Sequence, residues 1–129
     1  MSAVTDSNAT APASSLASST AFRNFAIVFG IATPVIYVIL ELGNWPLFTY
    51  YPAVDGFKLG YGAGSDELGP AMHWYGWTVA TMLAASILGL LATKLPENAV
   101  KRIPLSLVWI LPVVAVPILI YSLRFYWRW

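Results

Sequence analysis

The sequence of 129 residues contains no cysteine. This absence excludes disulfide bonds, thiolate zinc sites, iron–sulfur clusters and haem attached through thioether bonds. Charged residues are also scarce, at 10% of the chain, where a soluble domain averages about 25%. The seven basic and six acidic residues nearly balance. There is therefore no electrostatic basis for binding nucleic acid.

Histidine is nearly absent too, since His73 is the only one. Haem held by two histidines of this chain is excluded by that count. The nearest carboxylates, Asp66 and Glu67, are separated from His73 by a Gly-Pro pair, so we expect no metal site. No serine outside the N-terminal segment has an acid–base pair beside it in the sequence, as nucleophilic catalysis would require. We expect that the chain alone is not an enzyme.

The sequence does contain three long apolar runs, residues 25–42, 71–93 and 104–123, which together hold one charged residue, Glu41. Each run is close to the ~20 residues that a helix needs to cross the hydrocarbon core of a bilayer. The sequence therefore predicts an all-α membrane protein with three transmembrane helices in a single bundle over residues 22–129. Residues 1–21, rich in Ala, Ser and Thr, are predicted to be a disordered tail.

The connection between the first two runs is rich in aromatic residues, glycine and proline. Aromatic side chains of this kind favour the membrane–water boundary. We expect an ordered loop over the end of the bundle, with one short hairpin as an option. The chain closes on a second aromatic and basic belt, residues 121–129.

Small residues recur at four-residue spacing in the second run, a pattern that lets helices approach closely. This predicts that the second span lies at the centre of the bundle. Prolines within the first and third runs each remove a backbone donor and leave carbonyls without a partner in their own helix. The predicted helix-packing residues are Gly76, Ala80, Ala84, Ala85 and Gly89.

Glu41 and His73 are the candidate binding residues, because ionisable groups at membrane depth are often functional. If the first span ends where the second begins, the two side chains lie at similar depth, and a contact between them is allowed. They would then suit a proton-transfer or quinol site, or His73 would be an axial ligand of haem or chlorin. The simpler interpretation is that both side chains only anchor helix ends through hydrogen bonds at the membrane boundary.

These features support two functions. The first is an accessory or assembly subunit that packs against other membrane subunits or against itself. The reason is that the small-residue faces and freed carbonyls exceed what three helices can satisfy among themselves. No cofactor is expected for this function. The second is a redox- or pigment-associated subunit in which His73 and Glu41 border a haem, chlorin or quinone site shared with another chain.

The expected location is a bacterial inner membrane, with the chain embedded in its lipid bilayer. Placing the N-terminus in the cytoplasm puts four Lys/Arg residues on the inner side and three on the outer side. Basic residues favour the cytoplasmic side. The same orientation places the short basic connection, residues 94–103, inside.

Overall fold

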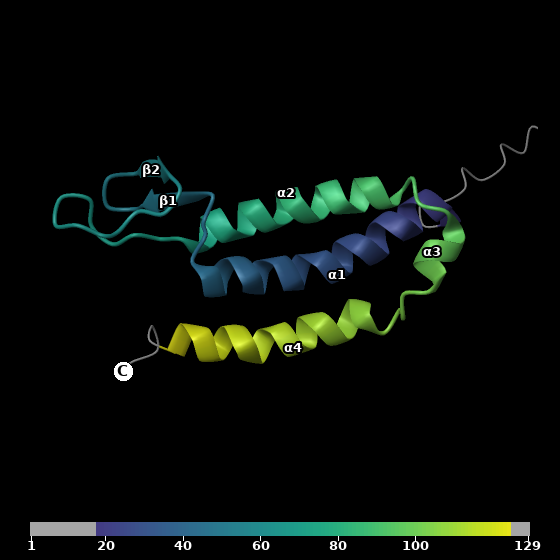
Figure 1. Cartoon of the computed structure of the whole chain (residues 1–129). Helices are drawn as coiled ribbons and strands as arrows, with labels where there is room; N and C mark the ends of the chain where they lie inside the picture. Colours follow the sequence, from purple (N-terminus) through teal and green to yellow (C-terminus); the bar gives the residue numbers. More distant parts are fainter. Residues whose placement is uncertain (1–17, 125–129) are drawn as a thin grey trace, which may run out of the picture.

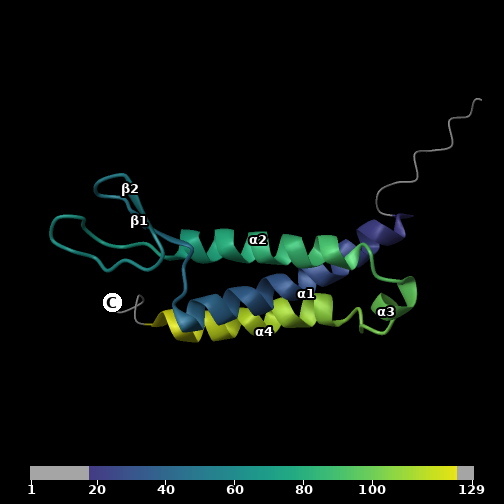
Figure 2. The same ribbon diagram turned by 45° about the horizontal axis from the view of Figure 1, so that its top comes forward.

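The computed structural model describes residues 18–124, and Figures 1 and 2 show the arrangement of its elements. Most of the predicted tail, and the belt beyond Arg124, lie outside the described residues. The described part holds four helices and one two-stranded sheet. In chain order these are α1 (Thr20–Gly43), β1 (Phe48–Tyr51), β2 (Gly56–Leu59), α2 (Trp74–Ala92), α3 (Glu97–Lys101) and α4 (Leu107–Ser122).

Helix α1 is longer than the predicted span because its caps lie outside the apolar run. It begins after Ser19, whose hydroxyl accepts a hydrogen bond from the Phe22 N–H, so the last two residues of the predicted tail, 20 and 21, belong to the helix. It ends at Gly43, and the next residue, Asn44, caps it in the left-handed conformation (φ 52°) and donates its N–H to the Glu41 carbonyl at 3.1 Å. Asn tolerates this conformation better than most residues, which is why it suits a helix terminus.

Helices α1 and α2 are long and apolar enough to cross a membrane. Helix α4 is equally apolar but has 16 residues, shorter than the predicted span of 104–123. Its first turn is lost because residues 104–106 form tight turns, with the Leu107 N–H donating to the Pro104 carbonyl. The structure thus supports a mostly helical chain with two membrane-length helices and a shorter apolar third one.

The three long helices lie in an open row with α1 in the middle (Figure 1). Helix α1 packs against both α2 and α4, while the described residues of α2 and α4 share no close backbone contact. The central helix is therefore α1, where the sequence had predicted the second span. Helix α1 meets α4 at Gly30 and α2 at Phe25, whereas the buried small-residue row of α2 lies on the side facing α1.

The direction of the helices is given by their contacts. Gly30 of α1 lies against Val108 of α4, and Glu41 lies against Ser122, so these two helices run parallel. Phe25 of α1 lies against Gly89 of α2, so that pair is antiparallel. Both α1 and α4 end where α2 begins, and the hairpin projects from this end (Figure 2).

The all-α prediction misses the β-hairpin in the aromatic connection. Strands β1 and β2 pair antiparallel, with Phe48 opposite Leu59 and Tyr51 opposite Gly56. The buried Thr49 fixes the chain just after β2, because its hydroxyl donates to the Gly60 carbonyl at 2.8 Å and accepts the Gly62 N–H at 2.9 Å. The sequence allowed for this hairpin only as an option.

The hairpin is fixed to the start of α2 rather than hanging free. Tyr50 exchanges two backbone hydrogen bonds with Met72, of 3.0 and 2.8 Å. Gly76 lies so close to the hairpin backbone that an added Cβ would overlap the Phe48 carbonyl oxygen. Glycine is needed at this position because only a residue without a side chain admits such an approach.

Candidate functional site

His73 is the residue that immediately precedes α2, and its ring lies among aromatic side chains at the hairpin end of the molecule. Its Nε2 is 2.8 Å from the Gly62 carbonyl oxygen. Tyr61 stacks on the imidazole ring with a centroid separation of 4.8 Å, and Trp77 flanks it at 6.0 Å. A carbonyl only accepts hydrogen bonds, so this contact requires the proton on Nε2. In this geometry Nε2 joins the loop to the helix and has no lone pair to offer a metal.

Glu41 lies in the last turn of α1 and is only 8% exposed. Its Oε1 accepts a hydrogen bond from the Ser122 hydroxyl of α4 at 2.6 Å. Its Oε2 is buried and has no hydrogen-bond partner among the described residues. A buried carboxylate oxygen without a donor is energetically costly. Glu41 therefore joins α1 to α4 through one oxygen, while its other oxygen is buried without a donor.

Glu41 and His73 lie at the same end of the molecule, and each has its own partner. Within residues 18–124, no hydrogen bond or ion pair joins the two side chains. The contact that the sequence allowed is not formed. Ser122 was missed as the partner of Glu41, although the alternation of three spans puts the ends of the first and third on one side. That signal was present in the sequence.

The predicted packing residues of α2 separate into two groups. Ala85 and Gly89 are buried, together with Thr81, on the face toward α1. Gly76 is buried as well, but by the hairpin rather than by a helix. Ala80 and Ala84 are only half-buried. Spacing alone could not separate these groups, because it shows which residues share a face and not what covers that face.

A groove with a volume of about 420 Å³ runs between α1 and α4. Its walls are apolar except for the hydroxyls of Thr33 and Tyr37, and it ends about one turn before Glu41. The lining residues are Phe29, Gly30, Thr33, Pro34, Tyr37, Val108, Pro112, Ala115, Val116 and Leu119.

Two prolines lie in this groove, one from each helix. Pro34 cannot donate to the carbonyl of Gly30, and Pro112 cannot donate to that of Val108, because proline has no N–H. Gly30 and Val108 also line the groove and contact each other. The groove therefore gathers backbone carbonyls that lack their usual helical donor. Membrane helices satisfy such groups through neighbouring helices or water.

In the described part of the chain, no group of three or more His, Asp or Glu residues could hold a metal ion. The comparisons with known proteins give no relative: no family model, no curated protein and no solved structure matches this chain. The class that can be stated is a mostly helical protein with two membrane-length apolar helices.

Proposed function

We propose that the chain is an integral membrane protein in which α1, α2 and α4 all cross the bilayer. The support is the outward face of the helices, where large apolar side chains are exposed along α2 and around most of α4. On α4 only Ala115 is buried. At 1.5 Å per residue, α4 spans about 24 Å. This falls short of a typical core of ~30 Å, and local thinning of the bilayer accommodates the difference at modest cost.

The charges at the two ends of the helix row favour an N-terminus in the cytoplasm of a bacterial cell. The α3 end carries four described cations and one carboxylate: Arg23, Lys94, Lys101, Arg102 and Glu97. The hairpin end carries two described cations and four carboxylates: Lys58, Arg124, Glu41, Asp55, Asp66 and Glu67. Basic residues near span ends favour the cytoplasmic side, which places the α3 end inside.

Orientation is tested by labelling single cysteines introduced into the cysteine-free chain. An impermeant thiol reagent added to intact cells should label Ser65→Cys, in the hairpin-end loop, and should not label Asn98→Cys, in α3. The reverse pattern would invert the orientation. Equal labelling of both sites in intact cells would contradict the membrane placement itself.

As for its role, we propose an accessory or assembly subunit that binds a helix of another membrane protein in the α1–α4 groove. The observation that supports this role is the open helix row. Among the described elements α4 packs against α1 alone, and the groove between them holds apolar walls with backbone carbonyls that lack helical donors. A partner helix with small polar residues would fill the walls and supply the missing donors, which are the interactions that join helices in a membrane.

The test is purification of the tagged full chain in a mild detergent, with two matched variants of α4. Val116→Trp fills the groove, because Val116 is one of its lining residues, whereas Val113→Trp adds the same bulk to an exposed position outside the groove. We expect a defined partner to co-purify with the wild type and Val113→Trp, and to be lost with Val116→Trp. Equal retention by both variants would contradict docking in the groove.

A second candidate function, a redox- or pigment-associated subunit, is favoured by one observation. The second carboxylate oxygen of Glu41 has no donor among the described residues, and the hydroxyl of a quinol that reached it would supply one. With Nε2 bonded to Gly62, His73 would ligate a haem or chlorin metal only through Nδ1. The absorption spectrum tests the haem or chlorin form of this second proposal. A Soret or chlorin band that disappears with His73→Ala supports that form, and a colourless complex contradicts it but leaves the quinol form standing.

A further inference from the structure

A second cavity lies at the opposite end of the helix row, where α3 crosses the start of α1. It has a volume of about 260 Å³. Its floor is apolar and its rim is charged. The lining residues are Arg23, Asn24, Ile27, Glu97, Val100, Lys101, Ile103, Pro104 and Leu105.

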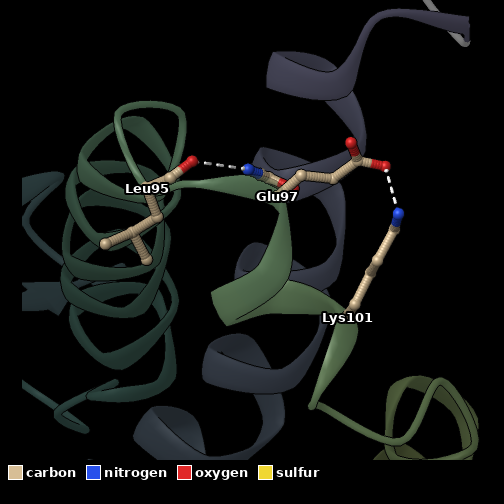
Figure 3. A network of polar contacts seen from close by, with 4 residues as sticks. Leu95, Glu97 and Lys101 are labelled. Atoms are coloured by element: carbon tan, nitrogen blue, oxygen red, sulfur yellow. Dashed lines mark hydrogen bonds and ion pairs between the residues drawn. The ribbon is translucent and has the colours of Figure 1, made fainter.

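The cavity is held in shape by buried contacts. Asn24 is 2% exposed, and its amide donates to the Leu95 carbonyl at 3.3 Å. This bond fixes the second turn of α1 to the segment that precedes α3, and Figure 3 shows it as the dashed line that ends at Leu95. Val100 of α3 is buried beside it. The floor is thus a fixed part of the fold rather than a gap between mobile loops.

The rim carries two cations and one carboxylate. Lys101 Nζ pairs with Glu97 Oε1 at 2.9 Å (Figure 3). The Lys101 hydrogen bond and charge lower the pKa of Glu97, and the charge of Arg23 contributes to the same shift. Arg23 therefore lies near enough to act on the same anionic group. Lys94 and Arg102 add two further positive charges at this end, so the mouth of the cavity favours an anion.

The position of the cavity defines what kind of anion fits it. In the proposed membrane placement, Arg23 and Lys101 lie at the level of the lipid headgroups. Ile27 and Leu105 then continue the floor toward the hydrocarbon core. Basic pockets between transmembrane helices on the cytoplasmic side are suited to anionic lipid headgroups. A soluble anion would use the charged rim but would gain nothing from the apolar floor.

We propose that this cavity binds an anionic glycerophospholipid. The lipid phosphate lies between Arg23 and Lys101, and one acyl chain runs over Ile27 and Leu105. The proposal rests on the membrane placement proposed above, and it does not depend on any partner in the α1–α4 groove. The Glu97–Lys101 pair is half-exposed, so Lys101 can turn from the carboxylate to a phosphate without unfolding α3.

The experiment measures lipid binding to the full chain in detergent micelles by native mass spectrometry. Phosphatidylglycerol and phosphatidylcholine of the same acyl length are titrated separately. We expect the wild type to bind phosphatidylglycerol preferentially. Arg23→Gln and Lys101→Gln should each lower that affinity about fivefold, the effect typical of one basic residue near an anionic lipid surface. The matched control is Arg102→Gln, which removes a positive charge at the same end from a residue outside the cavity. This variant should change the affinity by less than about twofold, because the charge of Arg102 lies away from the bound phosphate.

Three outcomes would overturn the proposal. The first is equal affinity for the two lipids, and the second is an equal loss in all three variants, which would indicate general surface charge. The third is full competition by millimolar inorganic phosphate, which would indicate a site for the free anion. Cysteine labelling at Ser65 and Asn98 tests the membrane placement independently. A failure of lipid preference with correct labelling would refute the lipid site alone.

Discussion

The α1–α2 interface and the α1–α4 interface differ in how closely their helices approach. Toward α2, the row formed by Thr81, Ala85 and Gly89 is buried, and Gly89 lies against the ring of Phe25. Toward α4, the contact is made through Gly30 and Val108 at one end and Glu41 and Ser122 at the other, with an open groove between them.

The cause of this difference is the residue types on each facing helix. Helix α2 has no proline and presents the small residues Thr81, Ala85 and Gly89, so it lies close to α1 over this row. Helix α4 contains Pro112 and Pro117 and is dominated by bulky aliphatic residues. Prolines bend a helix and interrupt its hydrogen bonds. We infer that α1 and α2, with the hairpin fixed to them, form the stable unit of the fold. Helix α4 is the element left accessible to other molecules.

Of the changes considered, Gly89→Leu should lower the stability of the protein most, because it disrupts the α1–α2 interface. A Cβ at this position would lie 2.7 Å from the Phe25 ring, so the added side chain must push the helices apart. Overpacking of this kind typically costs about 1–3 kcal/mol, and we expect the upper end, measured by thermal unfolding in detergent. Ala84→Leu is the matched change at a half-buried position and should cost clearly less. Equal destabilisation by both variants would contradict the close contact at Gly89.

Ser122→Ala should weaken the α1–α4 interface without unfolding the protein. This change removes the hydroxyl that donates to the buried carboxylate of Glu41. Loss of a hydrogen bond to a charged group costs about 1.5–3 kcal/mol. We expect α4 to separate from α1 more often, measured as weaker disulfide cross-linking between cysteines placed at Gly30 and Val108. Ser106→Ala, at the exposed start of α4, is the control and should leave cross-linking unchanged. Unaltered cross-linking in Ser122→Ala would show that the polar contact does not hold α4.

His73→Ala should affect neither helix interface, since His73 bonds to the loop at Gly62. We expect a loss of about 1 kcal/mol, the usual contribution of one hydrogen bond, together with faster proteolysis of the 60–72 segment. Cross-linking between α1 and α4 should be unchanged, and the complex should have no visible absorption band to lose. Disappearance of such a band would favour the redox proposal instead.

The smallest expected effect is the pH dependence of the Glu97–Lys101 pair. Its hydrogen bond and charge lower the pKa of Glu97 below its ordinary value of 4.5. The pair therefore stabilises the folded state at neutral pH, and this contribution is lost as the pH falls through the lowered folded-state pKa. Wild type and Glu97→Gln should differ slightly in thermal stability at neutral pH and converge in strong acid. A difference that persisted in acid would show that the side chain acts through packing rather than charge.

The helical part of the fold could be predicted closely from the sequence. The apolar runs located all three long helices, and the second, predicted at 71–93, is observed at Trp74–Ala92. The first helix was placed too late, because its capping residue Ser19 lies in the polar segment. The third was placed too early, because Pro104 was assigned to the helix and instead begins a turn. Such boundaries depend on one or two hydrogen bonds, which composition does not reveal.

The partners of the candidate residues could be predicted less well. The sequence placed Glu41 and His73 at one end of the helices, and the structure agrees in position. In the structure, Glu41 accepts a hydrogen bond from Ser122, which lies 81 residues away in the sequence, and His73 is hydrogen-bonded to the Gly62 carbonyl. No pattern in the sequence predicted the cavity between α1 and α3, because Arg23 and Lys101 are far apart in the sequence and belong to no recognisable motif.

The sequence alone was enough to predict a mostly helical chain with membrane-length apolar helices, the approximate positions of its three long helices and the end of the molecule at which each loop lies. These features result from local hydrophobicity and from the alternation of apolar runs, and both act along the chain. Three features became visible in the folded structure alone: α1 is central, Gly76 packs against the hairpin, and a groove and a cavity lie between the helices. The physical reason is that apolar helix faces resemble one another, so the choice among them depends on side-chain shape and on a few polar contacts between distant residues.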